Sequence, residues 1–179
     1  ILVTGGAGFI GSNFVRRRRS TVPGDRLVVF DAFTYAGNLA SLEDLDGIEV
    51  VRGDICDASA VERALGDHRI EAIVHFAAES HVDRSIHGPA PFIRTNVVGT
   101  ATLLECARAA KVERFVQVST DEVYGDIGNG PLATEASQIA PRSPYAASKA
   151  AADHLVAAWV NTYRFPALIT RCCNNYGPY

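Results

Sequence analysis

Short apolar runs alternate along the whole chain with longer segments in which apolar residues recur at helical spacing. The runs are nearly continuous in apolar character, which is typical of strands buried on both faces of a parallel sheet. They predict strands over Ile1–Thr4, Arg26–Phe30, Glu49–Arg52, Ala72–Phe76, Arg114–Ser119 and Ala167–Arg171. The segments between them predict helices over Gly11–Arg18, Ala58–Leu65, Pro91–Ala110 and Pro144–Arg164.

Strands and helices that alternate in this way predict an α/β fold with a doubly wound parallel sheet and helices on both faces. Right-handed crossovers give the Rossmann-like, dinucleotide-binding topology as the leading expectation. The sequence shows no internal repeat, linker or low-complexity tract, so residues 1–179 are expected to form one domain. The stretch Gly125–Pro144 contains glycine and proline, and we expect a loop that carries binding residues over a cleft.

Composition narrows the range of functions. The chain has 179 residues, 47% of them hydrophobic, and a formal net charge of −3, so it can bury a sizeable core and has no general attraction for nucleic acid. The basic run Arg16–Arg19 falls near the end of the first predicted helix, where cations suit the helix dipole. No apolar run approaches the roughly 20 residues that span a bilayer. We therefore expect neither a nucleic-acid nor a membrane partner.

Cysteine and histidine spacing points to ordinary structural roles. The four cysteines form no Cys-x-x-Cys pair, which indicates a reduced, cytoplasmic protein. Cys172 and Cys173 are adjacent on a predicted strand and are interpreted as packing residues. The histidines lack ligand spacing, so no metal site is predicted.

The two ends of the chain each interrupt a pattern. The sequence contains no methionine, opens inside the predicted strand Ile1–Thr4 and stops at Tyr179, directly after the motif Asn174–Pro178. Natural termini rarely cut two motifs. We expect the chain to be a fragment of a longer protein.

A glycine-rich turn follows the first predicted strand and opens a helix. The segment Gly5–Gly11 satisfies both G-x-G-x-x-G and the wider G-x-x-G-x-x-G, in the strand–turn–helix context that the motif requires. Glycine lets a pyrophosphate approach the backbone N–H groups at a helix N-terminus. Asp31 ends the second strand, and its carboxylate can accept hydrogen bonds from ribose hydroxyls while repelling the 2′-phosphate of NADP. No basic residue follows in Ala32–Thr34, so the predicted cofactor is NAD.

Tyr145 and Lys149 stand four residues apart on a predicted helix and therefore share a face. Free tyrosine has a pKa of about 10, but a nearby lysine and a positively charged nicotinamide favour the phenolate. That phenolate could take a proton from a sugar hydroxyl as hydride leaves the same carbon. A surface Tyr–Lys pair is the alternative, and the position after the fifth strand of a nucleotide-binding fold favours the catalytic interpretation.

Asp121 and Glu122 follow the predicted fifth strand. Adjacent residues of a regular strand face opposite ways, so both can reach one ligand only if the strand ends at Thr120 and the chain turns. Ligands bind at the carboxyl ends of strands in this architecture. Two close carboxyl groups push their pKa values apart, which leaves one acid and one base. Next to a hydride site this pair predicts removal of water, and two solvated loop carboxylates are the alternative.

The glycine motif Thr4–Ser12 and the pair Tyr145-x-x-x-Lys149 resemble the extended short-chain dehydrogenase/reductase family. Within it, essentially the whole chain resembles the dTDP-glucose 4,6-dehydratases, through the segments Thr34–Asn38, Ala77–Ser85, Ser119–Gly125 and Asn174–Pro178. The Thr-Asp-Glu motif is the specific part of the resemblance. Sugar epimerases lack that carboxylate pair, and GDP-mannose dehydratases usually have serine before the glutamate.

The resemblance implies a hydro-lyase of deoxysugar biosynthesis and assigns a role to each residue. Tyr145 deprotonates the hydroxyl at carbon 4 of dTDP-glucose while hydride passes to NAD, and Lys149 supports Tyr145. Glu122 removes the proton at carbon 5, and Asp121 protonates the hydroxyl that leaves carbon 6. Hydride then returns to carbon 6 to give the 4-keto-6-deoxy sugar nucleotide. Thr120 is grouped with these catalytic residues.

The resemblance also implies binding residues and a partner. Substrate contacts fall on Ser80, Thr120 and Asn174. Cofactor contacts fall on Gly5, Gly8, Phe9, Ile10, Gly11, Asp31, Ala32, Phe33, Thr34, Asp54, Ile55, Phe76, Ala77, Ala78, Glu79, Ser80, Thr95, Tyr145, Lys149 and Asn175. Family members pair as homodimers through the two long helices. A further C-terminal region, which supplies much of the nucleotide-sugar pocket in the family, is missing from this chain.

Other functions remain open at this point. The chain could serve a related nucleotide-sugar epimerase or decarboxylase, or a dehydratase of another nucleotide sugar. A non-catalytic NAD-binding regulator is an alternative from a different class. A regulator needs only the glycines and Asp31, so the presence of Tyr145, Lys149 and the carboxylate pair favours an enzyme.

Overall fold

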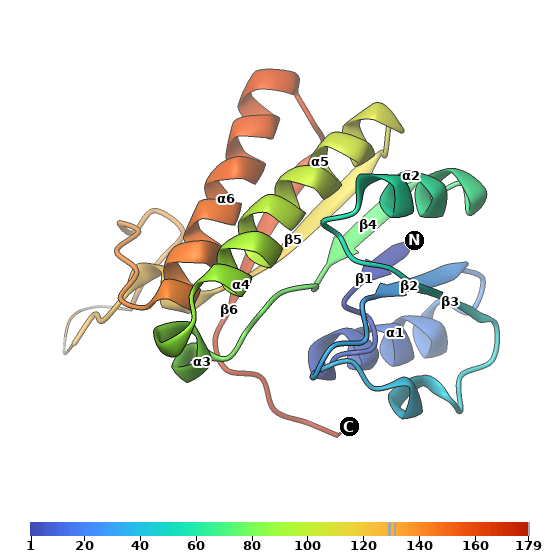
Figure 1. Ribbon diagram of the computed structural model, residues 1–179, viewed down its shortest axis with the longest axis horizontal. Helices are drawn as coiled ribbons and strands as arrows, with labels where there is room; N and C mark the ends of the chain where they lie inside the picture. The colour runs from blue at the N-terminus through green and yellow to red at the C-terminus, as the bar shows by residue number, and fades with distance from the viewer. Residues whose placement is uncertain (129, 131, 179) are drawn as a thin grey trace.

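A six-stranded parallel sheet forms the centre of the computed structural model, which describes residues 1–128, 130 and 132–178 (Figure 1). The strand order is β3-β2-β1-β4-β5-β6, and each neighbouring pair is parallel. This order confirms the predicted doubly wound topology, in which the chain reverses direction across the sheet between β1 and β4. The strands are β1 (Leu2–Thr4), β2 (Leu27–Asp31), β3 (Ile48–Arg52), β4 (Ala72–His75), β5 (Arg114–Thr120) and β6 (Ala167–Cys172).

Helices cover both faces of this sheet, as the alternation of apolar runs and helical segments predicts. The longer ones are α1 (Phe9–Thr21), α2 (Ala58–Asp67), α5 (Thr100–Ala109) and α6 (Pro144–Tyr163). The shorter ones are the 3-10 turns η1 (Leu39–Leu42) and η3 (Asp121–Tyr124), the α-helices α3 (Val82–His87) and α4 (Ala90–Phe92), and the π-helical η2 (Ile93–Gly99). The sequence pattern did not predict η1, α3 or η3.

Strand β2 shows how the two faces are filled. Val28 and Phe30 belong to a core cluster that includes side chains of α2, α5 and α6. Leu27 and Val29 belong to a second cluster that includes Val15 of α1. Alternate residues of a strand point to opposite faces, so a run that is apolar at every position buries both of them.

The predicted helix Pro91–Ala110 is interrupted by a π-helical stretch. Helical structure runs from Ala90 to Ala109, but residues Ile93–Gly99 follow the wider π spacing. Within this stretch Asn96 is fully buried and bonds the backbone of the loop after β4. A π segment changes the local period without changing the residue types that a helix prefers, so hydrophobic periodicity does not reveal it.

The predicted loop Gly125–Pro144 contains neither helix nor strand among its described residues up to Ser143, and α6 begins at Pro144. Asn129 and Pro131 of this loop lie outside the described residues. Ser143 caps α6, because its hydroxyl accepts a hydrogen bond from the N–H of Ala146 at 3.0 Å. The cap fixes where α6 starts, and therefore where Tyr145 stands.

Candidate functional site

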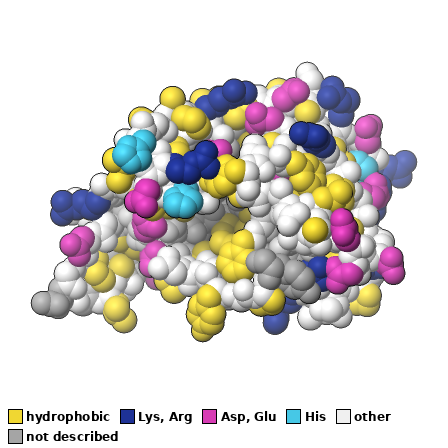
Figure 2. Space-filling view, turned by 60° about the horizontal axis from the view of Figure 1, so that its bottom comes forward, with side chains coloured by type: hydrophobic (Ala, Val, Ile, Leu, Met, Phe, Trp, Pro, Cys, Tyr) yellow, Lys and Arg dark blue, Asp and Glu magenta, His cyan; other side chains and the backbone are white. Residues whose placement is uncertain are grey.

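A cavity of about 560 Å³ lies at the carboxyl ends of the strands, between the half of the sheet built on β1–β3 and the half built on β4–β6. Figure 2 shows a hollow near the centre of the face on which these strand ends lie. Polar and catalytic residue types from both halves line the same space. This is the position at which open α/β sheets bind ligands.

The glycine-rich turn forms one wall of the cavity and requires glycine for steric reasons. Gly5 has a φ of +67°, and a Cβ there would stand 2.5 Å from the backbone nitrogen of Ala77. A Cβ on Gly11 would stand 2.2 Å from the carbonyl oxygen of Gly5. Both contacts are with backbone, which has little room to move. The turn therefore brings the start of α1 close to the cavity with its first N–H groups free to bind an anion.

Asp31 reaches the cavity from the end of β2. Its two carboxylate oxygens accept hydrogen bonds from the N–H groups of Ala7, at 3.0 Å, and Phe33, at 2.8 Å. An ionised carboxylate can accept about four hydrogen bonds, so capacity for ligand hydroxyls remains. Phe33, which the resemblance assigns to the cofactor, does not line the cavity and packs instead against the core beside α1. Its backbone N–H orients Asp31.

The opposite wall, after β4, is held by the π-helical segment. Asn96 Oδ1 accepts from the N–H of Glu79 at 2.8 Å, and its Nδ2 donates to the carbonyl of Glu79 at 2.9 Å. The same Nδ2 donates to the hydroxyl of Ser148 at 2.8 Å, and that hydroxyl donates to the carbonyl of Tyr145 at 2.7 Å. Asn96 was missed from the sequence, although an asparagine among the apolar residues of a predicted helix is a usable signal, because a buried amide needs hydrogen-bond partners.

Strand β5 ends at Thr120, and the chain turns there as the carboxylate pair requires. The Thr120 hydroxyl accepts a hydrogen bond from the N–H of Glu122 at 3.2 Å and starts η3. The turn places the Glu122 side chain in the cavity wall, half-buried. Asp121 is exposed and does not line the cavity. The structure therefore brings one of the two carboxylates to the site.

Tyr145 and Lys149 reach the cavity from the first turns of α6. The N–H of Tyr145 donates to the Ser85 hydroxyl at 3.1 Å, which ties the helix start to α3. Lys149 is buried, and its ammonium donates to the carbonyl of Val118 at 2.8 Å. Both side chains line the cavity together with Glu122 and Thr120. The four residues come from β5, η3 and α6, which meet at this point.

Burial governs the electrostatics of these groups. It lowers the pKa of Lys149 to about 8, while the negative charge of Asp153 acts in the opposite direction. Burial also raises the pKa of Tyr145 to about 12, the charge of Glu122 adds to that rise, and the hydrogen bond from Thr120 opposes it. The pKa of Glu122 is raised by burial and then by the charge of Asp121. A raised pKa makes Glu122 a stronger base once it is ionised.

Every residue assigned from the sequence lines the cavity except Phe33 and Asp121. The assigned residues Ser80, Thr95, Asn174 and Asn175 are all in its wall. Further lining residues, which were not assigned to the site from the sequence, are Phe30, Ala36, Gly37, Gly53, Val118, Ser119, Cys172 and Cys173. The interpretation of Cys172 and Cys173 as packing residues was wrong, because β6 ends at Cys172 and both cysteines face the cavity.

Two negative findings apply to the part of the chain that the structure describes. Its His, Cys, Asp and Glu side chains form no group of three or more that could hold a metal ion. None of its helices is both long enough and apolar enough to cross a membrane.

Comparison with known proteins gives consistent matches over nearly the whole chain. The chain is 54% identical to dTDP-glucose 4,6-dehydratase of Xanthomonas campestris, over 99% of its length and 54% of the relative. It is also 54% identical to the low-salt glycan biosynthesis protein Agl12 of Haloferax volcanii, over 99% of its length and 57% of that protein. The chain thus spans about half the length of the curated relatives it matches.

Solved structures agree with these relatives. The structure of DesIV, a dTDP-glucose 4,6-dehydratase from Streptomyces venezuelae with NAD bound, superposes with a TM-score of 0.93 at 55% identity and covers 99% of this chain and 56% of that one. UDP-glucose 4-epimerase from Thermus thermophilus, in complex with NAD, gives a TM-score of 0.88 at 35% identity, over 95% of this chain and 53% of that one. A family model described as GDP-mannose 4,6 dehydratase matches residues 2–179. The chain therefore belongs to the family that this model describes, together with the dTDP-glucose 4,6-dehydratases it resembles.

Proposed function

We propose that the full-length protein that contains this chain converts dTDP-glucose to dTDP-4-keto-6-deoxyglucose with bound NAD. The relatives at 50–54% identity that carry this enzyme name support the substrate. The cavity supports the chemistry, because it joins a dinucleotide cradle to Tyr145, Lys149 and Glu122. The reaction removes water from the sugar, which makes the protein a hydro-lyase.

The cradle fits NAD on steric and electrostatic grounds. Close backbone approach at Gly5 and Gly11 leaves room for a pyrophosphate at the start of α1, and Asp31 offers acceptors for the ribose hydroxyls. Ile55 and Thr95 also line the cavity. When bound, NAD supplies a reversible hydride acceptor beside the sugar.

Tyr145 is the base for the hydroxyl at carbon 4. Its high pKa keeps it protonated at neutral pH in the protein alone, so it requires positive charge near the phenol oxygen. Lys149 is buried in the same wall and carries one such charge below about pH 8. Thr120 lines the same wall as the phenol, and we expect Ser80 and Asn174, which also line it, to contact the substrate.

Glu122 is the base for the proton at carbon 5, which becomes acidic once carbon 4 is a ketone. Its half-buried position and raised pKa suit proton removal. Asp121 is the acid for the hydroxyl that leaves carbon 6. Its carboxyl oxygen lies 3.4 Å from the hydroxyl of Thr120, a residue that lines the cavity.

The placement of Glu122 beside Tyr145 is the observation that carries the proposal. It gives the hydride site a second base, which a simple dehydrogenase does not need. The test uses the full-length protein with dTDP-glucose in deuterated water. We expect a 4-keto-6-deoxy product with deuterium at carbon 5. An epimerised sugar formed without loss of water would contradict the proposal and favour the epimerase alternative.

Glu122→Gln separates the two chemical steps. The variant keeps the size of the side chain but cannot accept a proton, so we expect bound NAD to be reduced while deuterium exchange at carbon 5 falls by at least about 100-fold. NADH absorbance and mass spectrometry of the sugar report the two steps. Unchanged turnover would remove Glu122 from this role.

We also propose that the protein is a cytoplasmic homodimer that pairs through α5 and α6 and the segments beside them. Ile93 and Val98 are exposed apolar residues on the helical stretch that leads into α5, and burial of such residues favours association. Sedimentation velocity of the full-length protein tests this, and a monomer at micromolar concentration would contradict it.

A further inference from the structure

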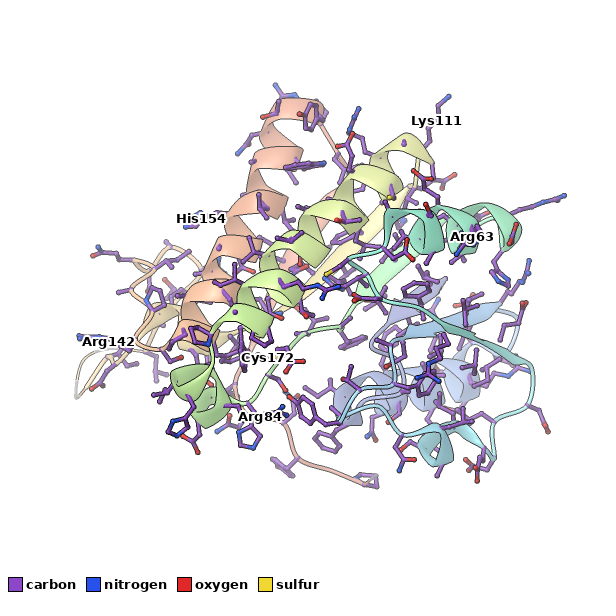
Figure 3. All side chains as sticks on the ribbon, in the orientation of Figure 1. Arg63, Arg84, Lys111, Arg142, His154 and Cys172 are labelled. Atoms are coloured by element: carbon purple, nitrogen blue, oxygen red, sulfur yellow. The ribbon has the colours of Figure 1, made fainter. Side chains whose placement is uncertain are left out.

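Arg171 of β6 contacts two elements of the site at once. Its Nε is 2.9 Å from a carboxylate oxygen of Asp153, on α6, and its Nη1 donates to the hydroxyl of Tyr124 at 2.9 Å. The guanidinium carbon lies 5.2 Å from the centre of the Tyr124 ring. Arg171 stands next to Cys172, which lies in the cavity wall at the end of β6 (Figure 3).

Each partner of Arg171 belongs to an element that carries a catalytic side chain. Tyr124 is the last residue of η3, the turn that presents Glu122. Asp153 lies one helical turn after Lys149 and two turns after Tyr145, on the same side of α6. Arg171 is therefore a bridge between the turn that bears the proposed carbon 5 base and the helix that bears the proposed hydride-transfer residues.

The burial of the Arg171–Asp153 ion pair costs free energy, so a purely stabilising role does not explain it well. The Asp153 side chain is 1% exposed and that of Arg171 18% exposed. A buried ion pair is often no more stabilising than apolar residues of the same volume, because both charges lose their hydration. The second carboxylate oxygen of Asp153 is buried without a hydrogen-bond partner among the described residues. The negative charge of Asp153 also favours the ammonium form of Lys149, four residues earlier on the same helix.

We propose that Arg171, Asp153 and Tyr124 form a positioning unit that sets the turn carrying Glu122 against the helix carrying Tyr145 and Lys149. The unit rests on the proposed function, because it aligns the proton-abstracting step with the hydride step of the same reaction. Its three members act through Glu122 and Lys149. Through Tyr124 the unit fixes the position of η3, and through Asp153 it affects the charge on Lys149.

Arginine is required at the centre of the unit. Its planar fork reaches Asp153 through Nε and Tyr124 through Nη1 in one fixed geometry, whereas a lysine ammonium is a single point charge that cannot span both partners in the same way. Arg171→Lys therefore keeps the charge and loses the bridge.

The experiment uses the full-length protein loaded with NAD and mixed with dTDP-glucose in deuterated water. NADH absorbance reports hydride removal, and deuterium at carbon 5 reports the action of Glu122. Tyr124→Phe deletes only the hydroxyl that Arg171 holds. We expect it to slow deuterium entry about tenfold, in the range of one lost hydrogen bond to a charged group, while NADH formation stays within about twofold.

Tyr163→Phe is the matched control. Tyr163 also faces an arginine, Arg108, whose guanidinium carbon is 4.8 Å from its ring, but this pair lies on the surface at the far end of α6. We expect neither step to change in this variant. A similar slowing in both tyrosine variants would overturn the positioning role.

Asp153→Asn tests the effect of Asp153 on Lys149, and the measurement is a pH profile of NADH formation. The groups whose charges act with that of Lys149 are Asp153 on α6, Cys172 on β6 and His75 on β4. Removing the Asp153 charge takes away the attraction that favours the ammonium, so the pH at which the rate stops rising moves lower. A profile that overlays that of the unsubstituted protein would contradict the effect of Asp153 on Lys149.

The outcomes also separate this proposal from the proposed function. If the unsubstituted protein does not dehydrate dTDP-glucose, the function fails and the positioning unit fails with it. If that protein is active and Tyr124→Phe leaves deuterium entry unchanged, or slows both steps equally, only the positioning unit fails. Selective slowing in Tyr124→Phe and Arg171→Lys, with normal Tyr163→Phe, supports it.

Discussion

Lys149 is buried beside the reacting groups with its ammonium bonded to a backbone carbonyl, at 2.8 Å from Val118. Burial removes the water that normally stabilises the charge, so the pKa of Lys149 falls to about 8. An amine is cationic below its pKa and neutral above it. Near pH 7 Lys149 therefore still carries its charge, and it loses that charge within the range in which enzymes are commonly assayed.

We predict that the rate of NADH formation in a single turnover rises with pH up to about 8 and then levels off, because loss of the Lys149 proton above that pH offsets the further gain of the Tyr145 phenolate. Lys149→Arg keeps a positive charge at all accessible pH values because arginine does not deprotonate, so its rate is expected to be lower but to go on rising above pH 8. Stopped-flow measurements from about pH 6.5 to 9.5 report the profile. A rate for the unsubstituted protein that goes on rising up to about pH 9.5 would contradict the role of the Lys149 charge.

The residue types at this site can be read from the sequence, but the directions of their side chains cannot. The spacing of Tyr145 and Lys149 places both on one helix face, and the structure keeps them there. From the sequence alone, nothing shows which of the two side chains, Asp121 or Glu122, points into the cavity. Only the 3-10 turn decides that Glu122 points into the cavity while Asp121 remains exposed. Turn geometry of this kind depends on the Thr120 hydroxyl, which the pattern of apolar residues does not register.

His75 connects three elements inside the protein. Its Nδ1 lies 2.6 Å from the Thr4 hydroxyl at the end of β1, and its Nε2 lies 3.1 Å from the Thr100 hydroxyl on α5. The Thr100 hydroxyl donates to the carbonyl of Asn96 at 2.7 Å, so its oxygen accepts from Nε2–H, which assigns the acceptor role to Nδ1. A neutral ring satisfies both contacts. Full burial, and then the charge of Lys149, lower the pKa of His75 to about 3.

This shift predicts a loss of stability in acid. An unfolded histidine has a pKa of about 6.5, so between about pH 6.5 and 3 the unfolded chain binds a proton that the folded chain does not. The contribution of His75 to the free energy of unfolding is therefore fully present above about pH 6.5 and is lost as the pH drops below that value. One proton corresponds to about 1.4 kcal/mol of unfolding free energy per pH unit. Urea unfolding of the full-length protein at several pH values measures this slope.

Substitution of His75 tests whether this residue causes the dependence of the unfolding free energy on pH. His75→Gln keeps one donor and one acceptor but does not titrate, so the slope between about pH 6 and 4 is expected to become shallower by about one proton. His154→Gln removes an exposed histidine on the outer side of α6, where Figure 3 shows it pointing away from the helix bundle. That variant is expected to keep the full slope. Equal slopes in the unsubstituted protein and His75→Gln would contradict the assignment.

The strands and the four longer helices can be predicted from the sequence, because the spacing of apolar residues and the length of each segment are enough to identify them. The short elements cannot. Segment α3 has only six residues, and its Ser85 matters because the hydroxyl accepts from the N–H of Tyr145. The π-helical stretch has the same residue types as an ordinary helix. What marks it is the buried amide of Asn96, whose partners come from elements that lie far away in the sequence.

At the scale of the whole molecule, the cavity is the place where the two halves of the sheet meet. Asp31 and the glycine turn come from the half built on β1–β3, whereas Glu122, Tyr145 and Lys149 come from the half built on β4–β6. The strand order explains this arrangement, because β1 and β4 are neighbours whose following segments leave the sheet in opposite directions. A dinucleotide bound there touches both halves and is expected to stabilise them together.

We predict that NAD raises the Tm of the full-length protein more than NADP does. A ligand that binds only the folded state at about 100 times its Kd adds about 2.7 kcal/mol of stability. We expect Asp31 to be the discriminating group, because its buried carboxylate lines the cavity, can accept hydrogen bonds from ribose hydroxyls and would repel a 2′-phosphate. Differential scanning fluorimetry with each nucleotide over a range of concentrations measures the two shifts.

Asp31→Asn tests the source of this preference. The amide keeps the shape of the side chain but removes its charge, and it can accept from only one of the two N–H groups, of Ala7 and Phe33, that the carboxylate satisfies. The variant is therefore expected to be less stable before any nucleotide is added. The ratio of the NAD shift to the NADP shift is independent of that cost, and we expect it to fall towards one. A ratio already equal to one in the unsubstituted protein would contradict the role of Asp31 in selecting the cofactor.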